Sequence, residues 1–297
     1  MPDMVEIMTP ATIAKPRPGN TRTTGKEQFY TPTELAAALV AEVAALVPDF
    51  AERTVLEPAG GTGAFVAAAK SAGAKKVLSF DIEPKSAGVI EADFLAIHPE
   101  LKDLSKAITI SNPPFGRNNS LSIPFFNLAA KHSDVIAFIV PRSWRKWSVI
   151  NRLDRNFELV SDQDLQIDYV DEAGSSIWQR NNLNTCFQIW RRSEKLRPLI
   201  RVRDAGLIER ATPQTADVAL TCFGFSCGKV STDFARVPNT TSMFLRVHDV
   251  RALKALHEVD YSKFFRNTAY TEALSLPEVR FLVQEAVLGD SGLTEEH

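Results

Sequence analysis

Residues 112–115 combine an amide, two prolines and an aromatic ring directly after the apolar run 107–110. A planar amine is a poor nucleophile because its lone pair is delocalised into the group that carries it. If the Asn112 side-chain oxygen and the Pro113 backbone carbonyl each accept one N–H, the amine nitrogen can pyramidalise towards an electrophile. Pro114 restricts Pro113 to an extended conformation, and Phe115 offers a ring for stacking. Together with the glycine-rich turn that precedes it by about fifty residues, the run predicts methyl transfer to a planar amine.

A glycine-rich turn, Glu57-Pro58-Ala59-Gly60-Gly61-Thr62-Gly63, follows an earlier apolar segment. Gly61 and Gly63 would allow the backbone to approach a ligand closely, because they carry no Cβ. A dinucleotide-binding fingerprint would place a third glycine three residues beyond Gly63, where Val66 stands. The turn thus predicts a ligand site but disfavours a nicotinamide cofactor.

Acidic residues follow the turn at positions that suit an adenosine-containing ligand. Asp81 ends the second apolar segment, where a carboxylate can accept both hydroxyls of a ribose. Asp93 offers an acceptor for an adenine amine, and Phe94 offers a ring beside it.

These residues are separated by an alternation of short apolar segments and stretches that can form helices. Apolar segments stand at 54–56, 77–80, 107–110 and 135–140. The alternation predicts an α/β fold with a parallel, doubly wound sheet. Residues 184–190 alternate more clearly and predict an antiparallel edge strand. Thr31-Pro32-Thr33-Glu34 predicts a capping box at the start of a helix before the first strand.

The pattern changes after Arg191, where a basic stretch is broken by Pro198. We therefore expect a catalytic domain at 27–192 and a small C-terminal α+β region at 193–290. Within that region 218–247 looks β-rich, whereas 250–257 and 277–288 look helical. The Pro-, Thr- and Lys/Arg-rich residues 1–26 predict a mobile N-terminal tail, and 291–297 a frayed acidic tail.

Taken together, these motifs resemble those of the S-adenosylmethionine-dependent adenine-N6 methyltransferases. The resemblance covers roughly residues 28 to 190, and Gln28-Phe29-Tyr30-Thr31-Pro32 precedes the glycine turn as in the gamma-class motif order. It implies a Rossmann-like class I methyltransferase sheet and a C-terminal target-recognition region. Glu57 stands where many relatives have aspartate, and Gly60 where many have cysteine.

The resemblance also implies S-adenosylmethionine as cofactor and a role for each matching residue. Its methionine part would meet Tyr30 and Thr31, its ribose Asp81, and its adenine Asp93 with Phe94. A target adenine in a duplex would leave the stack by base flipping. The implied catalytic residues are Asn112, Pro113, Pro114 and Phe115, and the implied cofactor contacts are Tyr30, Thr31, Glu57, Pro58, Gly61, Gly63, Asp81, Asp93 and Phe94.

Basic and aromatic residues are interleaved after the apolar run 135–140. This pattern suits phosphate contact and base stacking, and a surface helix with amphipathic tryptophans is the alternative. Trp178 and Phe187 are further candidates for stacking on a base, with core packing as the simpler interpretation of each. The expected substrate-binding residues are Arg142, Trp144, Arg145 and Lys146.

Composition limits the partners that the chain can have. The 297 residues carry 34 basic and 36 acidic side chains, so a surface for nucleic acid must be local. The N-terminal residues lack the apolar core of a signal peptide or a membrane span, and no membrane partner is expected. Three cysteines without ligand spacing predict reduced thiols in a cytoplasmic protein, and the histidines likewise indicate no metal.

Three classes of function fit the motifs. The first is methylation of adenine N6 in nucleic acid, with DNA expected and RNA open. The second is glutamine-N5 methylation of a protein, because those enzymes also carry an Asn-Pro-Pro-aromatic run; the segment 28–32 and the long C-terminal extension disfavour it. The third is a binding module without catalysis, which the intact motifs disfavour.

Overall fold

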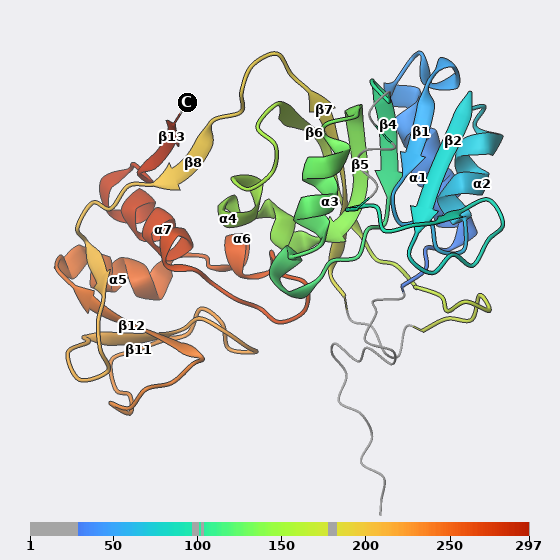
Figure 1. Ribbon diagram of the computed structural model, residues 1–297. Coiled ribbons are helices and arrows are strands. Elements are labelled where there is room, and N and C mark those ends of the chain that lie inside the picture. The colour runs from blue at the N-terminus through green and yellow to red at the C-terminus, as the bar shows by residue number, and fades with distance from the viewer. Residues whose placement is uncertain (1–28, 97–100, 102–103, 178–182, 297) are drawn as a thin grey trace, which may run out of the picture.

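The computed structural model of the protein describes residues 29–96, 101, 104–177 and 183–296. Its main element is a seven-stranded sheet. The strands are β1 (Thr54–Glu57), β2 (Lys76–Asp81), β3 (Ile90–Glu91), β4 (Ala107–Ser111), β5 (Ser133–Pro141), β6 (Phe157–Leu165) and β7 (Thr185–Arg192). Their order is β3-β2-β1-β4-β5-β7-β6, as Figure 1 shows in part. The strands β1 to β5 pair in parallel, which confirms the predicted Rossmann-like, doubly wound α/β sheet.

The antiparallel strand lies inside the sheet, so the prediction of an edge position is wrong. β7 pairs antiparallel with β5 on one side and with β6 on the other. β6 forms the edge, and the sequence did not predict it. Phe157 is the buried residue of β6, and the strand continues with mostly exposed side chains, several of them polar. It therefore lacks the apolar run that marks the inner strands.

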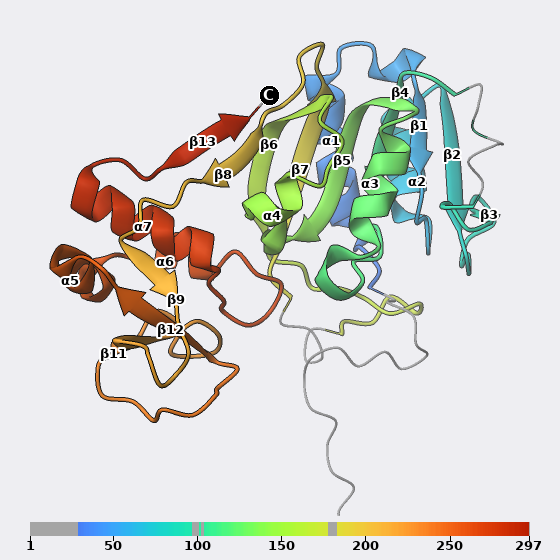
Figure 2. The ribbon, with the colours of Figure 1, turned by 60° about the vertical axis from the view of Figure 1, so that its left-hand side comes forward.

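Helices cover both faces of the sheet. On one face lie α1 (Thr33–Leu46) and α2 (Ala64–Ser71), and on the other lies α3 (Ser122–Ala129), in front of the sheet in Figure 2. Alternate residues of β5 face the two helix layers, so both faces are buried. The predicted capping box is wrong: α1 begins at Thr33 with Pro32 as its cap, and no side chain caps it.

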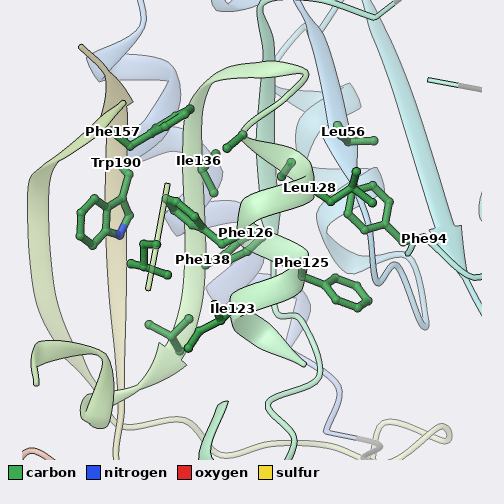
Figure 3. Close-up of a cluster of buried hydrophobic side chains, with 14 of the residues drawn as sticks. Leu56, Phe94, Ile123, Phe125, Phe126, Leu128, Ile136, Phe138, Phe157 and Trp190 are labelled. Carbon is green, nitrogen blue, oxygen red and sulfur yellow. The ribbon is translucent and has the colours of Figure 1, made fainter. Parts of the chain in front are cut away.

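Aromatic rings fill the core between α3 and the sheet (Figure 3). Phe126 lies at their centre, with ring centroids 5.6 Å from both Phe157 and Trp190. Its centroid is also 5.7 Å from that of Trp144, which is fully buried in the short 3₁₀ helix η4 (Arg142–Arg145). The sequence suggested that Trp144 stacks on a base; the structure corrects this, because the indole is part of the core.

The C-terminal part contains two further sheets. β8 (Leu199–Val202) pairs with β13 (Leu293–Glu296), so the expectation of a frayed tail is wrong for residues 293–296. The second sheet is antiparallel with the order β11-β10-β12-β9. Its strands are β9 (Ile208–Arg210), β10 (Val218–Thr221), β11 (Val230–Ser231) and β12 (Ser242–Val247). The helices are α5 (Val250–Glu258), α6 (Ser262–Phe265) and α7 (Leu276–Leu288).

The C-terminal unit, residues 199–296, packs on the end of the seven-stranded sheet through α4 (Trp147–Ile150). The Trp147 ring lies 5.4 Å from that of Phe264 and 5.5 Å from that of Phe281. Beside this cluster, the Lys146 ammonium is 3.0 Å from the Glu278 carboxylate, which is almost fully buried. The predicted N-terminal tail, residues 1–26, and Trp178 lie outside the described residues.

Two short 3₁₀ helices complete the described structure, η1 (Phe50–Glu52) and η3 (Arg117–Asn119). Across the described ranges, the helices are too short or too polar to traverse a lipid bilayer.

Candidate functional site

The glycine-rich turn connects β1 to α2 and is shaped by positive backbone angles. Gly61 has φ +46° and Gly63 has φ +83°, a region that favours glycine. A Cβ on Gly61 would come within 2.7 Å of the Tyr30 ring, so a side chain at this position would collide with it. The turn therefore brings bare backbone to the carboxyl ends of the strands, directly before the first turn of a helix.

The Asp81 carboxylate lies at the carboxyl end of β2 and fixes this turn. Its Oδ2 accepts from the Gly61 backbone N–H at 2.8 Å, and its Oδ1 accepts from that of Glu83 at 2.8 Å. Each oxygen retains a second lone pair, because an ionised carboxylate can accept about four hydrogen bonds. Asp81 can therefore hold the loop and a ligand hydroxyl at the same time.

Glu57 ends β1 beneath the turn and is completely buried. Its Oε1 accepts from the Ala59 N–H at 3.0 Å and from the Ser111 hydroxyl at 2.5 Å, while Oε2 has no partner among the described residues. Burial raises the pKa of Glu57 to about 8, and the two hydrogen bonds offset only part of that effect. The carboxyl is therefore largely neutral at pH 7.

Asn112 lies just beyond the end of β4, and its amide is oriented by a long-range contact. Its Nδ2 donates to the Phe29 backbone carbonyl at 2.9 Å. Because a carbonyl can only accept, this bond assigns the amide nitrogen to the Phe29 side and leaves the oxygen on the other. Asn112 Oδ1 is buried and has no partner among the described residues. The side chain thus presents an unused acceptor.

The segment that begins at Phe29 is held in place by a distant loop. Tyr30 and Val170 exchange backbone hydrogen bonds of 3.2 and 3.1 Å in an isolated antiparallel bridge. The same loop is tied to the glycine turn, because Lys85 forms an ion pair of 3.1 Å with Glu172 and its backbone N–H donates to Gly61. Burial raises the pKa of the Tyr30 phenol, which stays neutral.

These elements enclose a hollow of about 340 Å³, which we call the strand-end hollow. It lies where the chain leaves β1, β2 and β4, next to the point where the sheet order reverses, and α/β folds bind ligands at such points. Its lining is Phe29, Tyr30, Pro58, Ala59, Gly61, Asp81, Ile82, Ala92, Asp93, Phe94, Leu95, Asn112, Pro113, Pro114, Phe115, Leu121 and Phe125.

The structure brings most of the residues singled out in the sequence to this hollow. All four residues of the run 112–115 line it. So do six of the nine implied cofactor contacts, namely Tyr30, Pro58, Gly61, Asp81, Asp93 and Phe94. Three others, Thr31, Glu57 and Gly63, are buried outside the lining and support the elements that form it.

Several lining residues were not among the site residues expected from the sequence. Leu121 directly precedes α3 and Phe125 lies within it. An apolar side chain at a helix position is usually a core residue, so neither one indicated a ligand site. Ile82 is 55% exposed and directly follows Asp81. Its position next to this expected ribose-binding residue was the one sequence feature that could have placed it in the site. Phe29 belongs to the segment 28–32. Its carbonyl accepts from Asn112, which is 83 positions away, so the sequence could not show this contact.

The basic segment after β5 does not form a free cationic surface. Arg145 contacts Asp162 and Asp164 at 2.6 Å, and Arg142 contacts Asp164 at 2.9 Å. Lys146 is held by Glu278, as described above. Each of these three expected substrate-binding cations is thus paired with a carboxylate. Phe187 is also fully buried in the core, which excludes the base-stacking alternative for it.

A second hollow of about 530 Å³ lies between the seven-stranded sheet and the C-terminal unit; we call it the interface hollow. It shares Phe29 and Phe115 with the strand-end hollow, so the two are neighbours. Its lining is Phe29, Phe115, Gly116, Arg117, Asn118, Asn119, Pro141, Ser143, Lys146, Ser148, Val149, Arg152, Leu183, Phe223, Thr268, Ala269, Tyr270, Thr271 and Ala273.

Within the described ranges, His, Cys, Asp and Glu side chains form no group of three or more that could hold a metal ion.

No protein-family model matches the sequence, and no curated protein matches it. Among solved structures, the chain is similar to a candidate RNA methyltransferase from Pyrococcus horikoshii, with 21% identity and a TM-score of 0.41 over 56% of this chain and 87% of that one. It is also similar to the modification subunit of a candidate type I restriction enzyme from Vibrio vulnificus, with 16% identity and a TM-score of 0.44 over 62% and 49% of the two chains. At these values the likeness assigns neither reaction nor substrate.

Proposed function

We propose that the protein is an S-adenosylmethionine-dependent methyltransferase that acts on the exocyclic N6 amine of adenine in nucleic acid, with DNA as the first candidate. The strand-end hollow supports this proposal because it combines an acceptor for a planar amine with carboxylates suited to an adenosine. Its volume of about 340 Å³ is in the range of small-molecule sites.

The observation that carries the proposal is the state of Asn112. Its Nδ2 is committed to Phe29, while its buried Oδ1 has no partner among the described residues and belongs to a residue of the hollow wall. A buried acceptor left unsatisfied costs free energy, on the order of 1–3 kcal/mol. A bound –NH₂ group would satisfy it. The Pro113 carbonyl follows directly in the chain and would accept the second N–H of such a group.

The residues present fit the proposed cofactor. Asp81 has lone pairs left for ribose hydroxyls after holding Gly61 and Glu83, and the bare backbone at Gly61 lets the Tyr30 ring pack against the glycine turn beside it. Asp93 and Phe94 lie in the same wall and would contact the adenine. When bound, S-adenosylmethionine supplies a methyl group on a sulfonium, which is already activated for transfer.

The protein's own contribution is to orient the acceptor amine. Two fixed carbonyl oxygens would localise the nitrogen lone pair, and Phe115 would stack on the base and set its plane. Holding two reactants in the reactive geometry supplies much of the acceleration in such a reaction, so no strong general base is required.

Glutamine-N5 methylation of a protein is the alternative from another class, since a side-chain amide also presents a planar –NH₂. RNA adenine is the alternative within the same class. The interface hollow beside Phe115 favours nucleic acid over a peptide, because no carboxylate is among the residues that line it and two of its cations, Arg117 and Arg152, form no ion pair with a described residue.

Transfer of labelled methyl from S-adenosylmethionine tests the proposal directly. Matched duplex DNA, single-stranded DNA, RNA and a release-factor protein would be incubated with the enzyme, digested and resolved. Label in N6-methyladenine is expected. Label in glutamine with none in adenine would overturn the substrate assignment, and absence of saturable cofactor binding would overturn the reaction itself.

Asn112→Ala is expected to lower turnover by about 100- to 1,000-fold, the cost of removing one fixed polar group from the transition state. Cofactor affinity should change little, because Asn112 meets the acceptor amine in this proposal. Asn156→Ala is a suitable control, since Asn156 bonds only to its neighbour Asp154 among the side-chain contacts of the described residues. Equal losses of turnover and cofactor affinity would indicate a structural role for Asn112.

A further inference from the structure

The interface hollow differs in charge from the protein as a whole. The chain has a formal net charge of −2, yet this lining contains Arg117, Lys146 and Arg152 and, among described residues, no carboxylate. Lys146 is held by Glu278, but neither arginine forms an ion pair with any described residue. The two guanidinium groups are therefore available to an anion at the wall of a hollow next to Phe115.

The backbone holds both arginines in place. Arg117 lies in a tight loop whose residues Gly116, Asn118 and Asn119 all have positive φ, and Asn119 is bonded to the Ser143 hydroxyl at 3.1 Å. Consecutive left-handed residues are uncommon outside glycine and mark a constrained loop. The Arg152 carbonyl accepts from the Asn127 side chain at 3.0 Å. The backbone at each arginine is therefore held in place, and the exposed side chains extend from fixed points of the wall.

Aromatic rings and hydroxyls complete the hollow on the side of the C-terminal unit. Phe223 is 48% exposed, and its backbone is held in a bridge with Ala273. Tyr270 is 37% exposed in the same wall. Thr268 is buried, and its hydroxyl has no partner among the described residues. Cations alternating with exposed rings are the features that bind a nucleic-acid strand through its phosphates and base faces.

We propose that the interface hollow binds the strand next to the target nucleotide, with Arg117 and Arg152 on its phosphates and Phe223 on a flanking base. The inference rests on the proposed function for the identity of the target base. It adds that the substrate is a phosphodiester strand, held by the C-terminal unit and the loop after Phe115 together. A free nucleoside or a peptide amide would leave this hollow empty.

Salt-dependent binding tests the proposal. A labelled single-stranded DNA oligonucleotide containing adenine, and an RNA of the same sequence, would be titrated with the full chain over a range of KCl concentrations. Each phosphate contact on a single strand contributes about 0.7 to the slope of log affinity against log salt. Arg117→Gln with Arg152→Gln is therefore expected to lower the slope by about 1.4, and the two probes will show which strand binds more tightly.

The matched control is Lys131→Gln with Arg191→Gln. It removes the same charge at the opposite end of the sheet, where Arg191 pairs with Val135 at the start of β5. This control should leave the slope unchanged. A similar fall in both double variants, or in neither, would overturn the proposal.

Phe223→Ala separates stacking from charge. It is expected to weaken binding by about tenfold with the salt slope preserved, because the ring carries no charge. No change in affinity would remove Phe223 from the site. Failure of this proposal is distinguishable from failure of the proposed function. Methyl transfer to adenine with an unaltered salt slope in the arginine variant would refute only strand binding at the interface hollow. Arginine-dependent binding without methyl transfer would refute only the proposed reaction.

Discussion

Asp81 combines two tasks at the residue scale, since each oxygen already accepts a backbone N–H while facing the strand-end hollow. Asp81→Asn retains one acceptor and loses the charge. Cofactor affinity should fall by about 1.5–3 kcal/mol, the value of a hydrogen bond to a charged group, or on the order of tenfold to a hundredfold. Calorimetric titration with S-adenosylmethionine measures this.

Asp260→Asn provides the control for Asp81→Asn. Its Oδ1 also accepts a backbone N–H two residues ahead, from Ser262 at 2.9 Å, but in the C-terminal unit. The control should bind the cofactor as the parent chain does. An Asp81 variant with undiminished affinity would exclude this carboxylate from the cofactor site.

Glu57 predicts a dependence of stability on pH. Its pKa is 4.5 in the reference state and about 8 when buried, so the folded protein binds the proton more tightly than the unfolded chain. The stabilisation from this proton is complete below pH 4.5 and is lost as the pH rises through about 8, by about 1.4 kcal/mol per pH unit. Across that window the free energy of unfolding should therefore decrease.

Glu57→Gln keeps an uncharged acceptor at the same position. Urea unfolding of both proteins measures the free energy of unfolding at each pH. As the pH rises from 4.5 to 8, the parent chain should lose stability relative to the Glu57→Gln variant. Glu52→Gln makes the same chemical change at an exposed position of η1 and should show no such trend. A difference independent of pH would mean that Glu57 remains ionised in the folded protein.

At the scale of elements, the ion pair between Lys146 and Glu278 joins the residue between η4 and α4 to α7. The Glu278 carboxylate also accepts from the Ser275 N–H at 2.7 Å and completes the capping box of α7. Lys146→Met leaves this buried charge without its partner. We expect the protein to lose about 3–5 kcal/mol of stability in urea unfolding.

The second change, Glu278→Gln, removes the uncompensated charge and retains an acceptor for Ser275. The double variant Lys146→Met with Glu278→Gln should therefore recover most of the lost stability. If the loss of stability in the double variant equals the sum of the losses in the two single variants, Lys146 and Glu278 are not energetically coupled.

The same scale explains what the sequence could predict. β1, β2, β4 and β5 were recognisable because burial on both faces produces continuous apolar runs. β6 was not, because only its first residue is buried. The run 112–115 and Asp81 were recognisable because each follows an apolar run directly. The carboxyl ends of parallel strands lie at the same edge of the sheet, where α/β folds bind ligands.

The remaining features depend on contacts that no local pattern encodes. Lys146 and Glu278 are 132 positions apart, so the sequence could not show that this cation is already paired. Trp144 and Arg145 are adjacent, yet the first is core and the second is bonded to β6. An interleaved basic and aromatic segment therefore suggested a surface that tertiary packing removes.

For the whole molecule, the rings of Trp147, Phe264 and Phe281 form an apolar contact between the seven-stranded sheet and the C-terminal unit. Trp147→Ala should cost about 2–4 kcal/mol, since the indole is only partly buried. Amide hydrogen exchange should accelerate in α7 relative to β4 and β5, because the unit loses its support. Binding of an oligonucleotide should weaken while cofactor affinity is retained.

Phe234→Ala is the control for this prediction. Its ring packs on Phe244, 5.7 Å away, in a separate cluster of the C-terminal unit. This variant should leave oligonucleotide binding intact. If Trp147→Ala and Phe234→Ala weaken oligonucleotide binding equally, the aromatic contact at Trp147 does not position the interface hollow.

The carbonyl of Phe29 on the Asn112 amide has a consequence for biosynthesis. A ribosome releases residues 29–31 well before residues 112 and 170, to which this segment is bonded. Its bond to Asn112 can form only after 112 of the 297 residues have been made, and its bridge to Val170 only after 170. The growing polypeptide can therefore complete the proposed acceptor site only after β4 and the loop that carries Val170 have both been synthesised.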